Sequence, residues 1–442
     1  MEKKEDINMK YAFINAKVYD FNQFREDQYV IFDESILEVG NMSEFIDENY
    51  EIIDCKDHLV LPSFVVGHTH IYSTFARGMS VPFHPTNFQE ILDQLWWKMD
   101  RHLDNEMNYY SGIVSATDFM KNGVTSVIDH HASGKDIKGS LEMLKKAVTK
   151  DAGLRGLFCF ETSDRFDVDA CIKENLSFIE NNHSNVARGL FGMHASLSLS
   201  EETLRKISKV IKNHPIHIHV AESLMDQEDS LKKYNERVIE RLDRHGLLNE
   251  DSIITHALYV NDEELDIIKK RKCVIALNVN SNMNNSVGLP EYIRFKEKGI
   301  PVIIGNDGIS SSITSEYLTL YYSMHLKDGS PLEFGLGDLL DIINNTYDYV
   351  NRNLGAKLGR VEVGYNGDLL TIPYIAPTAL NEGNALGHLF FGLFNSFKPN
   401  NVFCRGVKVV GDYKIRNELT KKYREAKKYA DKLWENIKKE DA

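Results

Sequence analysis

Short runs of apolar and β-branched residues recur along the middle of the chain, and amphipathic stretches separate them. The eight runs span residues 63–70, 123–131, 153–160, 187–194, 214–222, 252–257, 273–278 and 300–307. Between them, segments such as 140–152, 201–213 and 262–272 carry apolar residues at intervals of three and four, the spacing of an amphipathic helix. Eight strand–helix repeats predict an α/β fold, a (β/α)₈ TIM-like barrel over residues 63–360. A doubly wound open sheet is the alternative, although no glycine-rich phosphate fingerprint follows the early strands.

The flanks of the predicted barrel have a different pattern. Residues 1–62 and 361–415 show short β patterns punctuated by turn residues. We expect them to form the two halves of one small, discontinuous β-sandwich domain that the barrel interrupts. The charged stretch 416–442 has apolar residues near one face and predicts a C-terminal helix whose role is packing.

Composition limits the classes of function. The 442 residues are 42% hydrophobic and 26% charged, which are globular values, and no apolar stretch reaches the ~18–20 residues of a membrane span. A net charge of −13 offers no electrostatic footprint for nucleic acid. Five scattered cysteines without a Cys-x-x-Cys pair, and a polar start without an apolar signal region, predict a cytoplasmic protein that contacts neither nucleic acid nor membrane.

Polar residues at the ends of the predicted strands suggest chemistry. The first run, "SFVVGHTH", ends in His68 and His70, and residues at i and i+2 of a strand face the same side. Such a pair can bind one metal ion, but many His-x-His pairs on strands only bond to neighbouring groups. The fifth run, "HPIHIHVAE", turns His217 and His219 inward and ends near Glu222.

The sixth and eighth runs add His256 and Asp307. The carboxyl ends of barrel strands meet at one face. We therefore predict a catalytic metal site there, with ligands that suit Zn²⁺: His68, His70, His219 and Asp307. Glu222 and His256 remain for proton transfer.

Simpler interpretations exist for single residues of this set. His217 lies deeper along its strand than His219 and is interpreted as a hydrogen-bonded core histidine. Asp307 taken alone is more typical of a helix cap than of a metal ligand. Chance placement of all these groups at the ends of strands 1, 5, 6 and 8 is improbable, which favours the site.

Five motifs of the chain together resemble the amidohydrolase superfamily, in its chlorohydrolase, guanine deaminase and S-adenosylhomocysteine deaminase branch. They are "LPSFVVGHTH", "HIHVAES", "ITHALYV", "NSN" and "GNDGISSS". "LWWKMDRHL", "TSVIDHHAS" and "NALGHLFFG" are most similar to SsnA-like aminohydrolases within that branch. The resemblance covers nearly the whole chain. Two departures affect the expected substrate shape: Asn306 replaces the usual threonine before the strand-8 aspartate, and "NVNSN" lacks the common Cys-Pro.

The resemblance implies one divalent metal per chain, Zn²⁺ or Fe²⁺, on the four ligands named above, and a homodimer. The fourth run, "ARGLFGMHA", carries neither the lysine nor the glutamate that two-metal relatives place there, which also indicates a single metal. The resemblance assigns proton transfer to Glu222 and His256, and a substrate contact to His194. We add His131, Trp96 and Ser310 as candidate substrate contacts.

These residues predict a hydrolytic deaminase acting on a small molecule. Metal-activated water would attack an electron-poor ring carbon of a purine, pterin or pyrimidine, while Glu222 moves the proton and His256 and Asp307 stabilise the intermediate. Residues 72–108 follow the first strand and are long enough for a lid, in which Trp96 and Trp97 would cover a flat substrate or simply pack in a helix core.

Other functions use the same residues. A chlorohydrolase or a cyclic-amide hydrolase would share the metal site, and the sequence hardly separates these from a deaminase. A non-catalytic binding protein is disfavoured, because a binding shell would not require both Glu222 and His256 beside the ligands.

Overall fold

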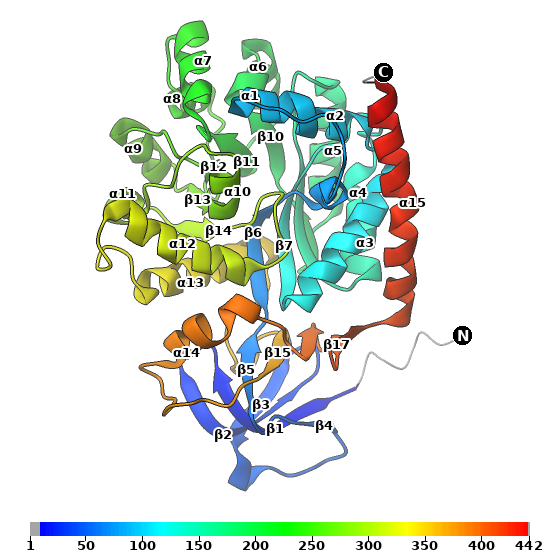
Figure 1. The fold of residues 1–442 in the computed structure, drawn as a ribbon, viewed down its shortest axis with the longest axis vertical. Helices are drawn as coiled ribbons and strands as arrows, with labels where there is room; N and C mark the ends of the chain where they lie inside the picture. Colours follow the sequence, from blue (N-terminus) through cyan, green and yellow to red (C-terminus); the bar gives the residue numbers. More distant parts are fainter. Residues whose placement is uncertain (1–8, 441–442) are drawn as a thin grey trace.

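The computed structural model describes residues 9–440; residues 1–8 of the first flank and 441–442 of the C-terminal stretch lie outside the described part. The middle of the chain forms a barrel of parallel strands with helices around it (Figure 1). Its strands are β6 (Phe64–Thr69), β7 (Val124–His131), β8 (Arg155–Phe160), β9 (Ala187–Gly189), β10 (Phe191–Ala195), β11 (Ile216–Val220), β12 (Ile253–His256), β13 (Val274–Leu277) and β14 (Val302–Ile304).

Two parallel sheets make up this barrel, in the orders β6-β7-β8-β9 and β10-β11-β12-β13-β14. Parallel bridges between Thr162 and Met193 and between Thr69 and Asp307 connect the two sheets on both sides. The fourth predicted run divides into β9, which pairs with β8, and β10, which pairs with β11. Glycine is required at Gly192, because an added Cβ would lie 2.2 Å from the Phe160 carbonyl oxygen. The predicted TIM-like barrel is confirmed.

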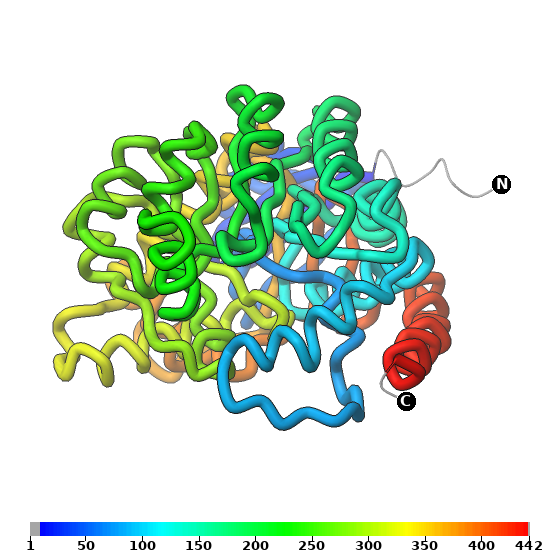
Figure 2. Tube along the Cα trace, turned by 90° about the horizontal axis from the view of Figure 1, so that it is seen from above, coloured from blue at the N-terminus to red at the C-terminus, as the bar shows by residue number. Residues whose placement is uncertain are grey.

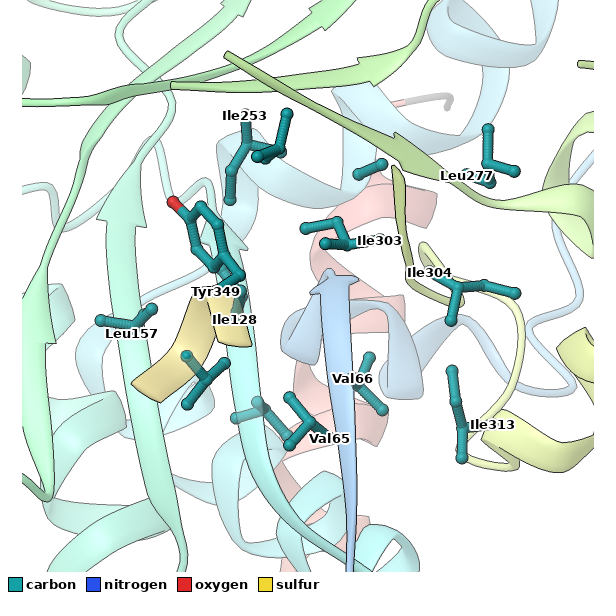
Figure 3. Close-up of a cluster of buried hydrophobic side chains, with 14 of the residues drawn as sticks. Val65, Val66, Ile128, Leu157, Ile253, Leu277, Ile303, Ile304, Ile313 and Tyr349 are labelled. Atoms are coloured by element: carbon teal, nitrogen blue, oxygen red, sulfur yellow. The ribbon is translucent and has the colours of Figure 1, made fainter. Parts of the chain in front are cut away.

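Helices between and after the strands surround the barrel, and one of them, α10, lies at the carboxyl ends of the strands. They are α3 (Asn105–Lys121), α4 (Ser140–Lys145), α5 (Val168–Asn181), α6 (Glu201–Ser208), α7 (Leu224–Tyr234), α8 (Val238–Arg244), α9 (Asp262–Lys270), α10 (Val279–Asn284), α11 (Tyr292–Lys298), α12 (Ile313–Asp328) and α13 (Leu336–Leu354). Figure 3 shows part of the buried core, which includes Val66 of β6, Ile303 of β14 and Tyr349 of α13. Not one helix within residues 9–440 is long and apolar enough to cross a membrane.

The segment between β6 and α3 lies along one side of the barrel when the molecule is seen from above (Figure 2). It contains the 3-10 helix η2 (Ile71–Ala76), the helix α1 (Phe88–Ile91), the π-helical turn η3 (Leu92–Trp96) and the helix α2 (Trp97–His102). Asn87 begins α1 by accepting a hydrogen bond from the Glu90 amide at 3.0 Å.

Both flanks of the chain contribute to one nine-stranded sheet below the barrel (Figure 1). The order is β18-β17-β16-β15-β5-β1-β2-β3, and β4 pairs with β1. The strands are β1 (Tyr11–Tyr19), β2 (Phe24–Phe32), β3 (Ile36–Asn41), β4 (Glu51–Asp54), β5 (His58–Pro62), β15 (Leu369–Pro373), β16 (Asn401–Cys404), β17 (Val407–Gly411) and β18 (Lys414–Ile415). Short helices, η1 (Met42–Glu44), α14 (Ala385–Gly392) and η6 (Phe394–Ser396), connect some of them.

The last helix, α15 (Asn417–Glu440), runs beside α3 along the barrel (Figure 1). Its apolar face buries Leu419, Ala426, Leu433 and Ile437, whose spacings of seven and four residues keep them on one helix face. The spacing seen in the sequence therefore serves packing.

A buried ion pair joins the barrel to the flanking sheet. Arg155, at the start of β8, donates to both carboxylate oxygens of Asp368, which precedes β15, at 3.2 and 2.9 Å. Both side chains are almost fully buried. Burial alone would raise the pKa of Asp368, but the positive charge and the hydrogen bonds of Arg155 together have the larger effect, so the pKa is lowered.

We predict that Asp368→Asn lowers the free energy of unfolding by about 3–5 kcal/mol, because it leaves the buried Arg155 charge without its partner. Folding lowers the pKa of Asp368, so its stabilisation is present above pH ~4 and is lost as the pH falls through the lower folded value. Urea denaturation followed by fluorescence measures the change. The matched control is Asp251→Asn, which breaks the more exposed pair with Arg352 (2.9 Å) and should change stability by less than ~1 kcal/mol. Equal losses in the two variants would contradict the prediction.

Candidate metal centre and active site

The four predicted metal ligands come together at the carboxyl ends of the barrel strands. One ligand atom from each of His68, His70, His219 and Asp307 lies within 4.8 Å of the others. The Nε2 atoms of His70 and His219 are 3.1 Å apart, and Asp307 Oδ1 lies 3.1 Å from His70 Nε2 and 3.8 Å from His68 Nε2. The arrangement is the three-imidazole, one-carboxylate set that the strand ends predict.

Backbone hydrogen bonds fix the ends of β6 and β14 against each other at this point. The amides of Asn306 and Asp307 donate to the His68 carbonyl at 2.9 and 3.2 Å, and the His70 amide donates to the Asp307 carbonyl at 3.2 Å. Asp307 itself has φ +52°, in the left-handed region that few residues other than glycine adopt. The chain therefore turns sharply at the carboxylate, which directs it toward the two histidines.

A second layer of hydrogen bonds holds each imidazole by its other nitrogen. His68 Nδ1 lies 2.8 Å from His217 Nε2, while His70 Nδ1 and His219 Nδ1 donate to the carbonyl oxygens of His130 and His194 at 2.6 and 2.9 Å. These bonds leave each Nε2 atom aimed at the common point. His217, which the sequence assigns to the core, is thus a buried histidine that orients a predicted ligand.

The donor atoms fit a divalent metal ion. His68 Nε2 is buried without a hydrogen-bond partner, and the facing Nε2 atoms of His70 and His219 cannot both be satisfied by each other unless one is protonated. Burial lowers the pKa of His70, but Asp307 and Glu161 outweigh it and raise the pKa to about 9. These two carboxylates therefore favour positive charge on His70, whereas burial lowers the pKa of His68 and His219. Three nitrogens with one carboxylate are typical ligands of zinc-like cations.

Glu222 and His256 lie beside the same cluster, Glu222 in the cavity lining and His256 fully buried. His256 Nε2 is 3.5 Å from Glu222 Oε2 and 3.7 Å from Asp307 Oδ2. Burial and the nearby Asp307 carboxylate raise the pKa of Glu222 to about 8, whereas burial lowers the pKa of His256 to about 4. A carboxyl group with a pKa near neutrality is suited to both taking and giving a proton.

Two more strand ends have left-handed backbones. Ala221, directly before Glu222, has φ +46°, and His256 has φ +71°. Such conformations cost non-glycine residues about 1–3 kcal/mol and are concentrated at functional sites. The barrel therefore holds β11 and β12 in bends that bring both side chains to the mouth.

A cavity opens from the predicted metal ligands toward the segment between β6 and α3. Residues from that segment and from the strand ends line it: Tyr72, Phe88, Leu92, Trp96, Trp97, Asp100, Glu161, His194, Leu197, Glu222 and Ile309. Residues 72–108 thus provide one wall, and both tryptophans face the cavity rather than only packing in a helix core. His194 also lines it, with its Nδ1 atom 2.7 Å from Ser198 Oγ.

Two candidate substrate contacts have other positions. His131 is fully buried, its Nε2 atom lies 3.1 Å from Ser133 Oγ, and its ring packs against the cavity residue Tyr72 at 5.8 Å. Ser310 lines an adjoining cavity that shares His70, Trp96 and Asp307 with the first. His131 therefore lies behind the wall of the main cavity, and Ser310 lines the adjoining one.

Several site residues were not identified from the sequence. Glu161 directly follows β8, one residue beyond the predicted run, and its Oε1 atom lies 3.3 Å from His130 Nδ1 and 3.5 Å from His70 Nδ1. Together His70, His130, Glu161 and His219 form a second group of possible ligands, which shares two histidines with the first. The signal was present, because an acidic residue at a strand end is the same pattern that identified Asp307.

An ion pair lies farther along the cavity wall. Arg165 Nη1 donates to Asp100 Oδ2 at 2.6 Å, and Arg165 Nη2 lies 3.6 Å from Glu161 Oε2. The Arg165 guanidinium also lies 4.9 Å from the Trp97 ring centre. No sequence motif marks this pair, because its members come from α2 and from the loop after β8.

Comparison with known proteins identifies the family. The model of the Amidohydrolase family matches residues 59–409, which is most of the chain and includes every predicted ligand. The chain therefore belongs to the amidohydrolase family, and the family resemblance of the sequence motifs is confirmed.

Individual relatives agree with this assignment. The chain is 25% identical over 404 residues to the 5'-deoxyadenosine deaminase of Methanosphaera stadtmanae, covering 89% of this chain and 92% of the relative. It is 27% identical over 348 residues to the 5-methylthioadenosine/S-adenosylhomocysteine deaminase of Pyrococcus furiosus, covering 76% and 80%. The zinc-bound crystal structure of an adenosine deaminase from Xanthomonas campestris superposes with a TM-score of 0.82 at 18% identity, covering 96% and 99%.

We predict that His219→Ala lowers the affinity for a divalent metal by at least ~10–100-fold, because it removes one of the ligands and opens the cluster. Elemental analysis after dialysis measures the metal bound per chain. The control is His183→Ala, which removes an exposed histidine whose Nε2 atom bonds only locally, to the Glu180 carbonyl at 2.8 Å. Full metal content in a folded His219→Ala variant would remove His219 from the ligand set.

Proposed function

We propose that this protein is a metal-dependent hydrolytic deaminase that releases ammonia from the exocyclic amine of an adenosine-type purine. The observation that carries the proposal is that Glu222 and the predicted metal ligand Asp307 line an aromatic-walled cavity, while the buried His256 lies 3.5 Å from the one carboxylate and 3.7 Å from the other. Membership of the amidohydrolase family and the two deaminase relatives agree with an enzyme that hydrolyses carbon–nitrogen bonds other than peptide bonds.

The ligand set His68, His70, His219 and Asp307 would hold the ion, and a divalent metal bound there supplies Lewis acidity that makes water nucleophilic near neutral pH. Glu222 accepts a proton from the attacking water at its carboxylate and then delivers it to the leaving amine nitrogen. His256 carries a hydrogen on Nε2, and this N–H stabilises the negative charge that develops on the attacking oxygen. Ammonia leaves, and a ring carbonyl remains.

The cavity would select a flat substrate. Trp96 and Trp97 offer aromatic faces to a heterocycle, and His194, held at Nδ1 by Ser198, presents its other ring nitrogen to a ring heteroatom. We retain His194 and Trp96 as substrate contacts. We do not retain His131 and Ser310 as direct contacts, because His131 lies behind Tyr72 and Ser310 lines the adjoining cavity.

Further features of the proposal concern the metal and the setting of the enzyme. We propose one ion per chain and Zn²⁺ in preference to Fe²⁺, because the second group of possible ligands shares His70 and His219 with the first. All five cysteines, which lie within residues 9–440, are free and buried, which supports a reducing, cytoplasmic setting. A homodimer stays a prediction.

We predict that Glu222→Gln retains the metal and the fold but lowers kcat by ~10²–10⁴, because the amide cannot move the proton between water and amine. Steady-state ammonia release and elemental analysis together separate chemistry from metal binding. Glu228→Gln, on an exposed position of α7, is the matched control. Loss of metal in Glu222→Gln would instead identify Glu222 as a ligand.

We also predict that the metal-loaded enzyme releases ammonia from 5'-deoxyadenosine, adenosine or related aminopurines. The measurement is an ammonia-coupled assay over a panel of aminoheterocycles that includes pterins and pyrimidines, with ultraviolet spectra to follow each ring. Chloride release from a chlorinated triazine, or opening of a cyclic amide, with every aminoheterocycle left intact would replace the deaminase assignment by the corresponding hydrolase. Metal removal by a chelator should abolish turnover, and Zn²⁺ should restore it.

A further inference from the structure

One short polar segment contacts all three groups that the proposed reaction uses. The segment consists of α10 and the following Asn285, and it connects β13 to the loop before α11. Ser281 Oγ donates to Asp307 Oδ2 at 2.6 Å, and Asn285 Nδ2 donates to Glu222 Oε1 at 3.3 Å. Between these two, Asn282 Nδ2 lies 2.8 Å from His256 Nδ1.

The contact between Asn282 and His256 bears on which His256 nitrogen carries the hydrogen. His256 Nε2 faces the Glu222 and Asp307 carboxylates at 3.5 and 3.7 Å, so these acceptors favour a hydrogen on Nε2. In the neutral ring, Nδ1 must then accept a hydrogen bond. Asn282 supplies this donor through its amide NH₂, and both side chains are fully buried, so water does not readily substitute for it.

The start of α10 is itself fixed by a buried acid. Glu316 of α12 accepts hydrogen bonds from the Asn280 amide at 3.1 Å and from Asn280 Nδ2 at 2.8 Å. Glu316 is fully buried. At the other end, the Val287 amide donates to the Asn282 carbonyl at 3.1 Å. The Asn282 amide is therefore held in place by its own backbone and by the anchored helix start.

From this arrangement we propose that Asn282 is a positioning residue, which holds His256 in the tautomer with its hydrogen on Nε2 and facing the reacting groups. The inference rests on the proposed function for its effect on turnover, whereas its effect on the His256 ring does not depend on any substrate. Asn282 acts through His256 and touches neither the metal ligands nor, in this assignment, the substrate.

The test is Asn282→Asp, which keeps the shape of the side chain but replaces the amide donor by an acceptor. A carboxylate beside Nδ1 favours a hydrogen on that nitrogen. The His256 ring then either becomes the neutral Nδ1–H tautomer, without a hydrogen on Nε2, or becomes an imidazolium with a hydrogen on both nitrogens. We expect the metal content to stay unchanged, KM to change by less than ~3-fold and kcat to fall by ~10²–10⁴, the range seen when a catalytic histidine is held in the wrong tautomer. Asn49→Asp, on an exposed turn of the flanking sheet, makes the same charge change far from the site and should leave kcat unchanged.

The decisive readout is the state of the His256 ring. Nitrogen NMR of ¹⁵N-histidine-labelled, zinc-loaded protein distinguishes the Nε2–H tautomer from the Nδ1–H tautomer and from the imidazolium, and a His256→Gln variant assigns the signals. We expect the Nε2–H tautomer in the natural chain and a hydrogen on Nδ1 in Asn282→Asp.

Two results would overturn the inference: an Nδ1–H ring in the natural chain, or an unchanged Nε2–H ring in folded, metal-loaded Asn282→Asp. If Asn282→Asp loses the metal or does not fold, Asn282→Leu provides the test instead, because it removes the donor without adding charge. In that variant a persistent Nε2–H ring with full turnover would equally overturn the inference. If no aminoheterocycle is turned over by the natural chain, the proposed function fails, while the NMR result still decides the role of Asn282.

Discussion

The convergence of three imidazoles and one carboxylate at one point of the barrel mouth is the constraint on which the rest of this structure depends. His68, His70 and His219 each direct Nε2 to this point, and His68 Nε2 has no hydrogen-bond partner of its own. Burying such donor and acceptor atoms unpaired would cost about 1–3 kcal/mol each. A bound cation satisfies them together, so folding at the mouth and metal binding are coupled.

Holding these groups together requires a backbone that ordinary strand ends do not provide. Ala221, His256 and Asp307 all have positive φ, at the ends of β11, β12 and β14. At Asp307, the parallel bridge to Thr69 and the hydrogen bonds around His68 compensate this strain, because they join the first and last barrel strands at that level. Ring closure of the barrel and the geometry of the site are therefore the same structural feature.

The site is also layered. Behind the predicted ligands, His217 and the carbonyls of His130 and His194 fix ring orientations, and beside them α10 contacts the proton-transfer groups. Groups in these outer layers need no reactivity of their own. Their effect is to remove rotational freedom from the groups that react, which is why small amide and hydroxyl side chains are sufficient there.

The sequence by itself determined the barrel strands and the clustering of the residues predicted as metal ligands and as the proton-transfer pair. Local rules apply to them: strand periodicity places His68 and His70 on one face, and parallel strands end at one mouth. Only the tertiary structure decided the contacts of Asn282 with His256, of Arg165 with Asp100, and of Glu161 with His130, whose partners lie 26 to 65 residues apart in the chain. It also placed His131 behind Tyr72 and Ser310 in the adjoining cavity. Loop paths and side-chain packing set such distances, and neither leaves a periodic signal in the sequence.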